Sequence, residues 1–144
     1  MARSPAPRSR PRPVVGALPA FELIEDRNAD YAKTEALSLI VENCWNGGIV
    51  VGTAKAVPIA VTVNDLVGIA GRLTLGGKLI GEGAAEDPAA TLAWLANHVA
   101  ERGRDLKAGM VVITGSLIPT VSIAPGQRAA FAVEGLGDVT MNVV

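Results

Sequence analysis

The pattern of apolar and polar positions predicts a mainly β chain with two helices, and the longer helix is the clearest element. In the segment 87–103, DPAATLAWLANHVAERG, apolar residues recur three and four positions apart, which places them on one face of an α-helix. Asp87 is a typical N-cap, Pro88 suits the first helical position, and Gly103 suits a left-handed C-terminal stop. We therefore predict a helix over 88–102.

Most of the other periodic segments are typical of strands. A strand is expected over 14–24, entered through Pro19, and the β-branched run 48–57, GIVVGTAKAV, predicts a buried strand. Alternating positions over 59–83 predict half-exposed strands joined by a two-residue hairpin turn at Gly76–Gly77. Strands thus dominate the middle third of the chain.

Two further regions complete the expected order of elements. A short helix is expected within 34–45, TEALSLIVENCW, and Cys44 within it is expected to be a small buried hydrophobe. From 106 onward the chain returns to strands: a buried strand ending at Thr114, a TGS turn, a second strand, a turn at 125–127 and alternating strands to the end. The predicted fold class is α+β, mostly β. Without a βαβ alternation, we do not expect a doubly wound nucleotide-binding fold.

Charge and composition limit the classes of partner that this chain can bind. Of 13 basic residues, four are arginines in the Pro-rich segment 1–15, which contains no acid; the rest of the chain carries nine basic and 14 acidic residues. We expect a disordered tail over 1–15 and one partial domain over 16–144. Nucleic acid is an unsuitable partner for this anionic domain. No apolar run approaches the length of a membrane span, so a cytoplasmic protein is expected.

The sequence lacks the residues that several common kinds of catalytic or binding site require. One cysteine and one histidine cannot build a zinc site, and His98 falls on the polar side of the predicted helix, so no catalytic triad is expected. The glycine-rich segments do not open a helix with the spacing of a phosphate loop. A hard, oxygen-preferring cation such as Mg²⁺ or Mn²⁺ remains as a metal option.

The densest group of carboxylates lies in FELIEDRNADY, residues 21–31. On a strand, Phe21 and Leu23 point to the apolar side and Glu22 points to the opposite face. Two roles for Glu22 stay open on the residues alone: an inward ligand to a cation, or a structural ion pair with Arg27.

Four segments together resemble a known family. They are PAFELIEDRNADY, NCWNGGIVVG, DPAATLAWLANHVAERGRDLKAGMVVITGSLIPT and PGQRAAFAVEGLGDVTMNV. Over about residues 17–144 the chain resembles the C-terminal half of the 2-keto-4-pentenoate hydratases, within the fumarylacetoacetate hydrolase superfamily. The resemblance implies a mixed β-roll with strongly bent sheets and the 88–102 helix packed on the outside.

The resemblance also implies a metal-dependent reaction. Family members bind one Mg²⁺ or Mn²⁺ through three carboxylates and hydrate 2-hydroxy-2,4-dienoates to 4-hydroxy-2-oxo acids in aromatic catabolism. By this resemblance Glu22 matches the third metal carboxylate. The other two come from an E-x-E motif upstream, and no pair of acids in this chain has that spacing. The family's lysine and aspartate that act as acid and base also lie upstream, so the catalytic residues stay unknown.

Further site residues follow from the resemblance. Thr114 and Gly115 match a loop that lines the substrate pocket, although a plain strand-end turn explains them equally well. Asn43 matches a substrate-side asparagine, but here Cys44-Trp45-Asn46 replaces the small pair that follows it in many hydratases. Asp26 and Arg27 are expected to form a supporting pair that orients the end of the strand.

Three functions compete at this point. The first is the hydratase reaction; the second is a related reaction on a 2-oxo acid, either decarboxylation of an oxalocrotonate-like acid or hydrolysis of an acylpyruvate. The third is a truncated, non-catalytic interaction module. A half-length chain leaves apolar sheet surface uncovered, so a homo-oligomer or pairing with a full-length relative is expected.

Overall fold

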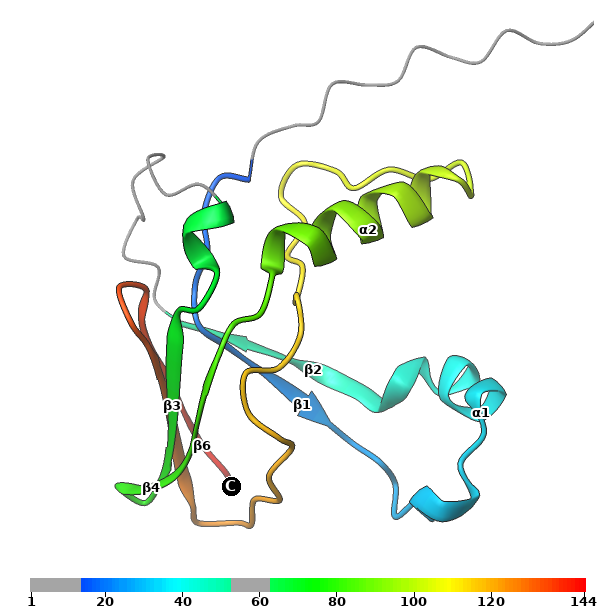
Figure 1. Ribbon diagram of the computed structural model, residues 1–144. Coiled ribbons are helices and arrows are strands. Elements are labelled where there is room, and N and C mark those ends of the chain that lie inside the picture. The colour runs from blue at the N-terminus through cyan, green and yellow to red at the C-terminus, as the bar shows by residue number, and fades with distance from the viewer. Residues whose placement is uncertain (1–13, 53–62) are drawn as a thin grey trace, which may run out of the picture.

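The computed structural model describes residues 14–52 and 63–144, which form two antiparallel sheets and a few helices (Figure 1). In chain order the elements are β1 (Ala20–Ile24), η1 (Tyr31–Lys33), α1 (Ala36–Val41), η2 (Asn43–Trp45), β2 (Asn46–Val51), η3 (Val63–Leu66), β3 (Ala70–Leu75), β4 (Lys78–Ala84), α2 (Pro88–Ala100), β5 (Arg128–Val133) and β6 (Gly137–Asn142). The predicted mainly β chain is confirmed, and the β-roll stays a prediction. The predicted tail 1–15 falls almost entirely outside the described residues, as does 53–57 of the strand expected over 48–57.

The larger sheet has four antiparallel strands in the order β4-β3-β5-β6. The predicted hairpin turn between β3 and β4 is confirmed, with φ of 56° at Gly76 and 83° at Gly77. Both values lie in the left-handed region that a two-residue turn of this kind requires, and glycine enters it without steric cost.

One face of the four-stranded sheet carries the small core. Leu73 lies opposite Phe131 in the ladder, and Phe131 lies opposite Val139, so the three side chains share this face. Among the described residues, the buried hydrophobic side chains of the core are Leu66, Ile118, Ala129, Val133, Leu136 and Val139. The core is thus concentrated on β5, β6 and the segments that cross this face.

The two strands predicted between 106 and 124 are wrong, because residues 104–127 contain turns but no strand. The segment crosses the core face of the sheet at glycines: the Leu117 carbonyl lies over Gly83, and the side chain of Ile118 lies over Gly81. Ile118 therefore packs against a sheet instead of pairing in one, whereas Val111 and Ile113 of the same segment are exposed. Strand propensity largely measures side-chain packing of the kind that Ile118 makes.

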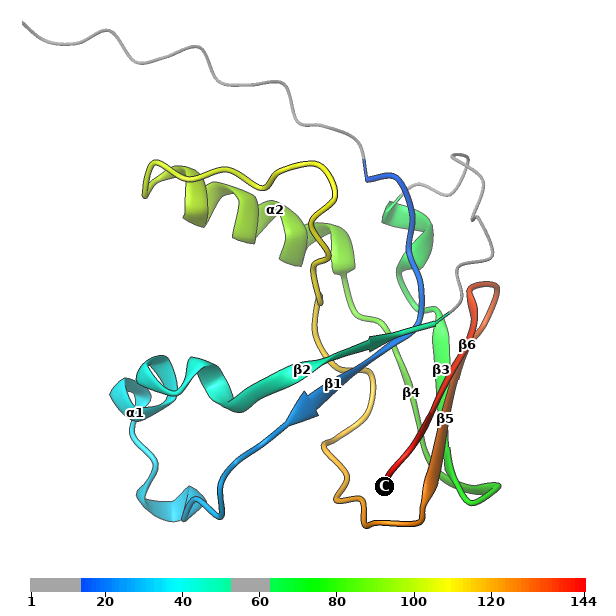
Figure 2. The ribbon, with the colours of Figure 1, turned by 180° about the vertical axis from the view of Figure 1, so that it is seen from behind.

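The smaller sheet, β1 with β2, extends away from the larger one and carries α1 at its far end; Figure 2 shows the same arrangement from behind. The short predicted helix is confirmed as α1, but its side chains are uncovered: Leu37, Ile40 and Val41 are 72%, 71% and 84% exposed. The prediction that Cys44 is buried is wrong, since it lies exposed in the turn after α1. The described part of the predicted buried strand, β2, is also largely exposed.

The long helix α2 is confirmed: it begins at Pro88 as predicted and ends at Ala100, two residues before the predicted end. The Asp87 side chain accepts a hydrogen bond of 2.8 Å from the Ala90 amide, and Gly103 has φ of 69° just beyond the helix. His98 stacks on Trp94, with ring centroids 4.9 Å apart. In the part of the chain that the structure describes, no helix combines the length and apolar character of a membrane span.

Candidate functional site

Glu22 lies in the middle of β1, on the face of the small sheet that the alternation predicted. It is paired with Ile49 in the ladder, while Phe21 and Leu23 face the other side. The ring of Phe21 lies 6.1 Å from that of Phe131, centroid to centroid, which directs the Phe21 side of the strand toward the four-stranded sheet. Glu22 itself is exposed in this chain.

The partner of Glu22 is an asparagine that the sequence did not single out. Asn46 Nδ2 donates a hydrogen bond of 2.8 Å to Glu22 Oε1. The alternative of a Glu22–Arg27 ion pair is wrong: among the described residues Lys33 pairs with Asp30 and Arg72 pairs with Glu82, and Glu22 and Arg27 form no ion pair with each other.

Asp26, at the turn after β1, is held by Tyr31. The Tyr31 hydroxyl donates to Asp26 Oδ2 at 2.7 Å, and the Asn28 amide donates to Asp26 Oδ1 at 3.0 Å. The Tyr31 hydrogen bond, followed by that of Asn28, lowers the pKa of Asp26, and the same Tyr31 bond raises the pKa of the Tyr31 hydroxyl. The predicted Asp26–Arg27 pair is therefore wrong: a tyrosine orients this carboxylate.

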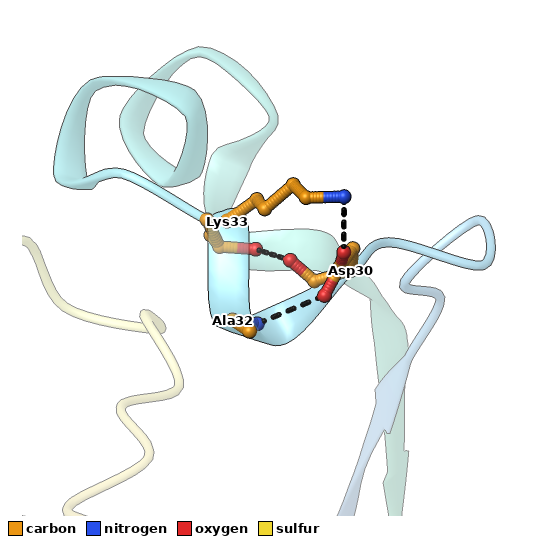
Figure 3. Close-up of polar contacts among 4 residues, drawn as sticks. Asp30, Ala32 and Lys33 are labelled. Atoms are coloured by element: carbon orange, nitrogen blue, oxygen red, sulfur yellow. Dashed lines mark hydrogen bonds and ion pairs between the residues drawn. The ribbon is translucent and has the colours of Figure 1, made fainter.

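Asp30 has a structural role (Figure 3). Its Oδ1 accepts from the Ala32 amide at 3.1 Å and so caps η1, and its Oδ2 lies 2.9 Å from the Lys33 ammonium. These contacts are local and solvent-exposed. Asp30 is thus engaged in forming the turn between β1 and α1.

The predicted loop residues Thr114 and Gly115 lie in the irregular segment that crosses the large sheet. Gly115 has φ of 116°, a conformation that favours glycine. The Ser116 hydroxyl donates to the Ile118 carbonyl, which closes the turn after Gly115. The turn is therefore fixed by its own hydrogen bond and by the close approach of Leu117 to Gly83.

Glu22, Asp26, Thr114 and Gly115 line one open hollow, which also includes apolar residues of α2 and β5. The lining of this hollow includes both Phe21 and Glu22, which face opposite sides of β1, so the shared lining does not by itself place Glu22 against Thr114. Asn43, although described, is not among the residues that line it. Asn43 lies in η2, between α1 and β2, and its substrate role stays a prediction.

Glu22 suits an oxygen-preferring cation as one donor of a set. It is an exposed carboxylate with one oxygen held by a neutral amide, and Mg²⁺ typically takes one or two carboxylates with water and substrate oxygens. Within 14–52 and 63–144, no group of three His, Cys, Asp or Glu side chains could hold a metal ion. A complete site therefore needs further oxygen donors besides those grouped here.

The comparisons place the chain beside hydratases and decarboxylases. It is 32% identical over 123 residues to 2-hydroxyhexa-2,4-dienoate hydratase of Comamonas testosteroni, a match that covers 83% of this chain and 45% of that relative. It is 27% identical over 128 residues to 2-keto-4-pentenoate hydratase 1 of Dechloromonas aromatica, covering 86% of this chain and 47% of the relative. No family model matches the chain.

A solved structure agrees with these relatives. The 4-oxalocrotonate decarboxylase from Pseudomonas putida G7, complexed with magnesium and adipate, superposes with a TM-score of 0.77 at 27% identity, over 88% of this chain and 48% of that one. The chain spans about half the length of the curated relatives it matches. Over that half it is similar in sequence to 2-keto-4-pentenoate hydratases and in structure to a 4-oxalocrotonate decarboxylase.

Proposed function

We propose that this chain provides part of the active site of a metal-dependent hydratase in aromatic catabolism. Its substrates would be 2-hydroxy-2,4-dienoates such as the enol form of 2-keto-4-pentenoate, and its products 4-hydroxy-2-oxo acids. The observation that carries the proposal is the shared hollow: Glu22, fixed by Asn46, lines it together with Thr114 and Gly115. These are the residues that match the hydratases in the resemblance.

The cofactor in this proposal is Mg²⁺ or Mn²⁺, with Glu22 as one ligand. Two structures of the P. putida decarboxylase were solved as complexes with divalent cations, one with magnesium and adipate and one with calcium and acetate, which supports a cation of this class. When bound, such an ion supplies Lewis acidity that stabilises negative charge on the 2-oxygen of the substrate.

The remaining described residues would bind and orient the substrate. The Thr114 hydroxyl and the Gly115 amide are hydrogen-bond donors in a turn that lines the hollow, and they would hold a substrate carboxylate. The apolar side chains of the hollow, such as Leu92 and Phe131, would exclude water from the hydrocarbon part of a dienoate.

Decarboxylation of 4-oxalocrotonate is the second candidate. It is favoured by the TM-score of 0.77 to a 4-oxalocrotonate decarboxylase and by 30% identity to the enzyme of that name from Pseudomonas putida. Both reactions begin with binding of a 2-oxo acid or its enol, so the described site alone is compatible with either.

The proposed site functions in an assembly, as a homo-oligomer or in a pair with a full-length relative. The support is the exposed apolar surface of α1, together with Ile24, Ile49 and Val51 on the Glu22 face of the small sheet, which are 40%, 42% and 45% exposed. Apolar surface of this extent typically marks a contact with another chain.

The test is turnover of a matched pair of substrates by the purified chain with Mg²⁺. Loss of dienoate absorbance from 2-hydroxypenta-2,4-dienoate would support the hydratase, and release of CO₂ from 4-oxalocrotonate would support the decarboxylase. The assay is repeated after addition of a full-length relative carrying an inactivating substitution, which can supply the remaining donors. No turnover in any combination would contradict both proposals and favour a non-catalytic interaction module.

A further inference from the structure

Asn46 holds Glu22 across the small sheet, although the two residues are 24 positions apart in the chain. The 2.8 Å bond from Nδ2 to Oε1 engages one oxygen of the carboxylate. A neutral donor of this kind restricts rotation of the carboxylate without adding a charge that would repel a cation. The bond therefore leaves the other oxygen, Oε2, available as a ligand atom for a cation, pointing in a defined direction.

A β-bulge brings Asn46 to the face of Glu22. Leu23 lies opposite Gly48, whereas the next residue, Ile24, lies opposite Asn46, so Gly47 is the extra residue of the bulge. Side chains directly opposite each other share one face of a sheet. In a regular ladder Gly47 would occupy this place and would present no side chain, so the bulge is what gives Glu22 a hydrogen-bonding neighbour.

The turn before Asn46 has an uncommon backbone conformation. Asn43, Cys44 and Trp45 have φ of 53°, 52° and 58°, in the left-handed region that few residues other than glycine adopt. Trp45 fixes the turn: its Nε1 donates to Glu42 Oε2 at 2.7 Å, and its carbonyl accepts from the Glu25 amide at 2.9 Å. Its ring also meets that of Tyr31 edge-on, with centroids 5.1 Å apart.

These contacts determine where β2 begins. The Glu25–Trp45 hydrogen bond joins the end of β1 to the residue just before Asn46, beside the bulge. Unfavourable backbone conformations persist when surrounding contacts determine them, and bulges are known to re-aim side chains next to functional groups.

We propose that Asn46 is a positioning residue for Glu22, which the bulge at Gly47 places so that the Glu22 carboxylate meets a divalent cation in one orientation. This inference rests on the proposed role of Glu22 as a ligand. It assigns a function to a residue that the sequence did not single out.

The test compares three variants of the full chain. Asn46→Leu removes the donor with little change of size, and Asn46→Gln keeps an amide on a longer side chain. Asn142→Leu makes the same chemical change at an exposed position of β6, in the other sheet. Asn46→Ala serves as a second truncation if Asn46→Leu does not fold. Mn²⁺ affinity is measured with oxalate present, from the broadening of ¹H–¹⁵N signals of β1.

We expect Asn46→Leu to weaken Mn²⁺ binding about 10-fold, the size typical of a residue that orients a metal ligand. Asn46→Gln should recover part of this loss, and Asn142→Leu should bind as the native chain does. A second readout needs no metal: Glu22→Gln should shift the side-chain amide signals of Asn46, because their acceptor loses its charge.

The outcomes separate this inference from the proposed function. If Glu22→Gln abolishes Mn²⁺ binding while Asn46→Leu and Asn46→Ala bind normally, Asn46 is not a positioning residue and the role of Glu22 stands. If Asn46 signals do not respond to Glu22→Gln, the inference is also overturned. If the native chain shows no Mn²⁺ effect near Glu22, either alone or with the inactivated full-length relative added, the proposed function fails, and the inference fails with it.

Discussion

The carbonyl oxygen of Leu117 occupies the place that a Cβ atom on Gly83 would need. Two segments of backbone therefore touch at this point, where the loop that carries Thr114 and Gly115 crosses β4. A side chain at 83 would force the loop away from the sheet. The glycine thus sets how closely the predicted pocket loop approaches the core.

Gly83→Ala is expected to lower the free energy of unfolding by about 3 kcal/mol, the upper end of the usual range for overpacking, because backbone must move to admit the methyl group. Urea denaturation followed by circular dichroism measures the change. Gly81→Ala is the matched control on the same strand: its Cβ would meet the Ile118 methyl group at 2.8 Å, which a side-chain movement can relieve. Equal destabilisation by both substitutions would contradict the backbone contact.

Tyr31→Phe is expected to raise the pKa of Asp26 toward its ordinary value, because it removes the hydrogen bond that contributes most to lowering it. A lowered folded-state pKa stabilises the fold above the unfolded pKa, and this contribution is lost as the pH falls through the folded value. Tyr31→Phe should therefore make the free energy of unfolding fall less steeply as the pH is lowered into the acid range. Titration of the Asp26 carboxyl carbon by NMR measures the shift, and an unchanged curve would contradict the hydrogen bond.

Gly76→Asn is expected to change the free energy of unfolding by no more than about 0.5 kcal/mol, because asparagine tolerates the left-handed conformation of this turn. Gly76→Val should cost about 1–2 kcal/mol or more, since a β-branched residue at φ of 56° clashes with its own backbone. Thermal denaturation of both variants tests the turn. Equal stability of the two would argue against a positive φ at residue 76.

Ile40→Asp is expected to reduce self-association of the purified chain, because it places a charge on the exposed apolar surface of α1. Light scattering after gel filtration gives the mass of the native chain and of the variant. Thr140→Asp, on an exposed position of β6, is the control for added charge elsewhere. If the native chain is monomeric at high concentration, the homo-oligomer is contradicted. Pairing with a full-length relative is then tested by mixing the two proteins and measuring the mass again.

The sequence was sufficient for elements whose signals are local. Asp87 and Gly103 mark the ends of α2, and the Gly76–Gly77 pair marks the hairpin, because caps and turns depend on a few neighbouring residues. The strands expected on either side of Thr114 were wrong for the opposite reason. Whether a β-branched segment pairs in a sheet or packs across one depends on residues far away in the chain, here on Gly81 and Gly83.

The candidate site shows the same difference between features that follow from neighbouring residues and features that depend on residues far away in the chain. The face of Glu22 followed from the alternation of a strand and is confirmed by the pairing with Ile49. Asn46 could not be predicted as its partner, because the bulge that brings it there exists only in the ladder between β1 and β2. The role of Tyr31 was missed because its hydroxyl reaches Asp26 through a turn whose backbone is left-handed at Arg27 and Asn28.

The central claim, that Glu22 is a ligand to a divalent cation, is tested most directly by adding Mn²⁺ and oxalate to the ¹⁵N-labelled chain. Bound Mn²⁺ broadens the signals of nearby amides, so even weak binding is located in the structure. We predict broadening centred on Glu22 and Asn46 that extends to Thr114 and Gly115, that oxalate strengthens, and that Glu22→Gln removes.

Glu82→Gln is the matched control, since Glu82 is also an exposed carboxylate held by one side chain, that of Arg72, and lies on β4 of the other sheet. It should leave the broadening unchanged. Broadening that is spread over the acidic surface, or that survives Glu22→Gln in a folded chain, would contradict the claim.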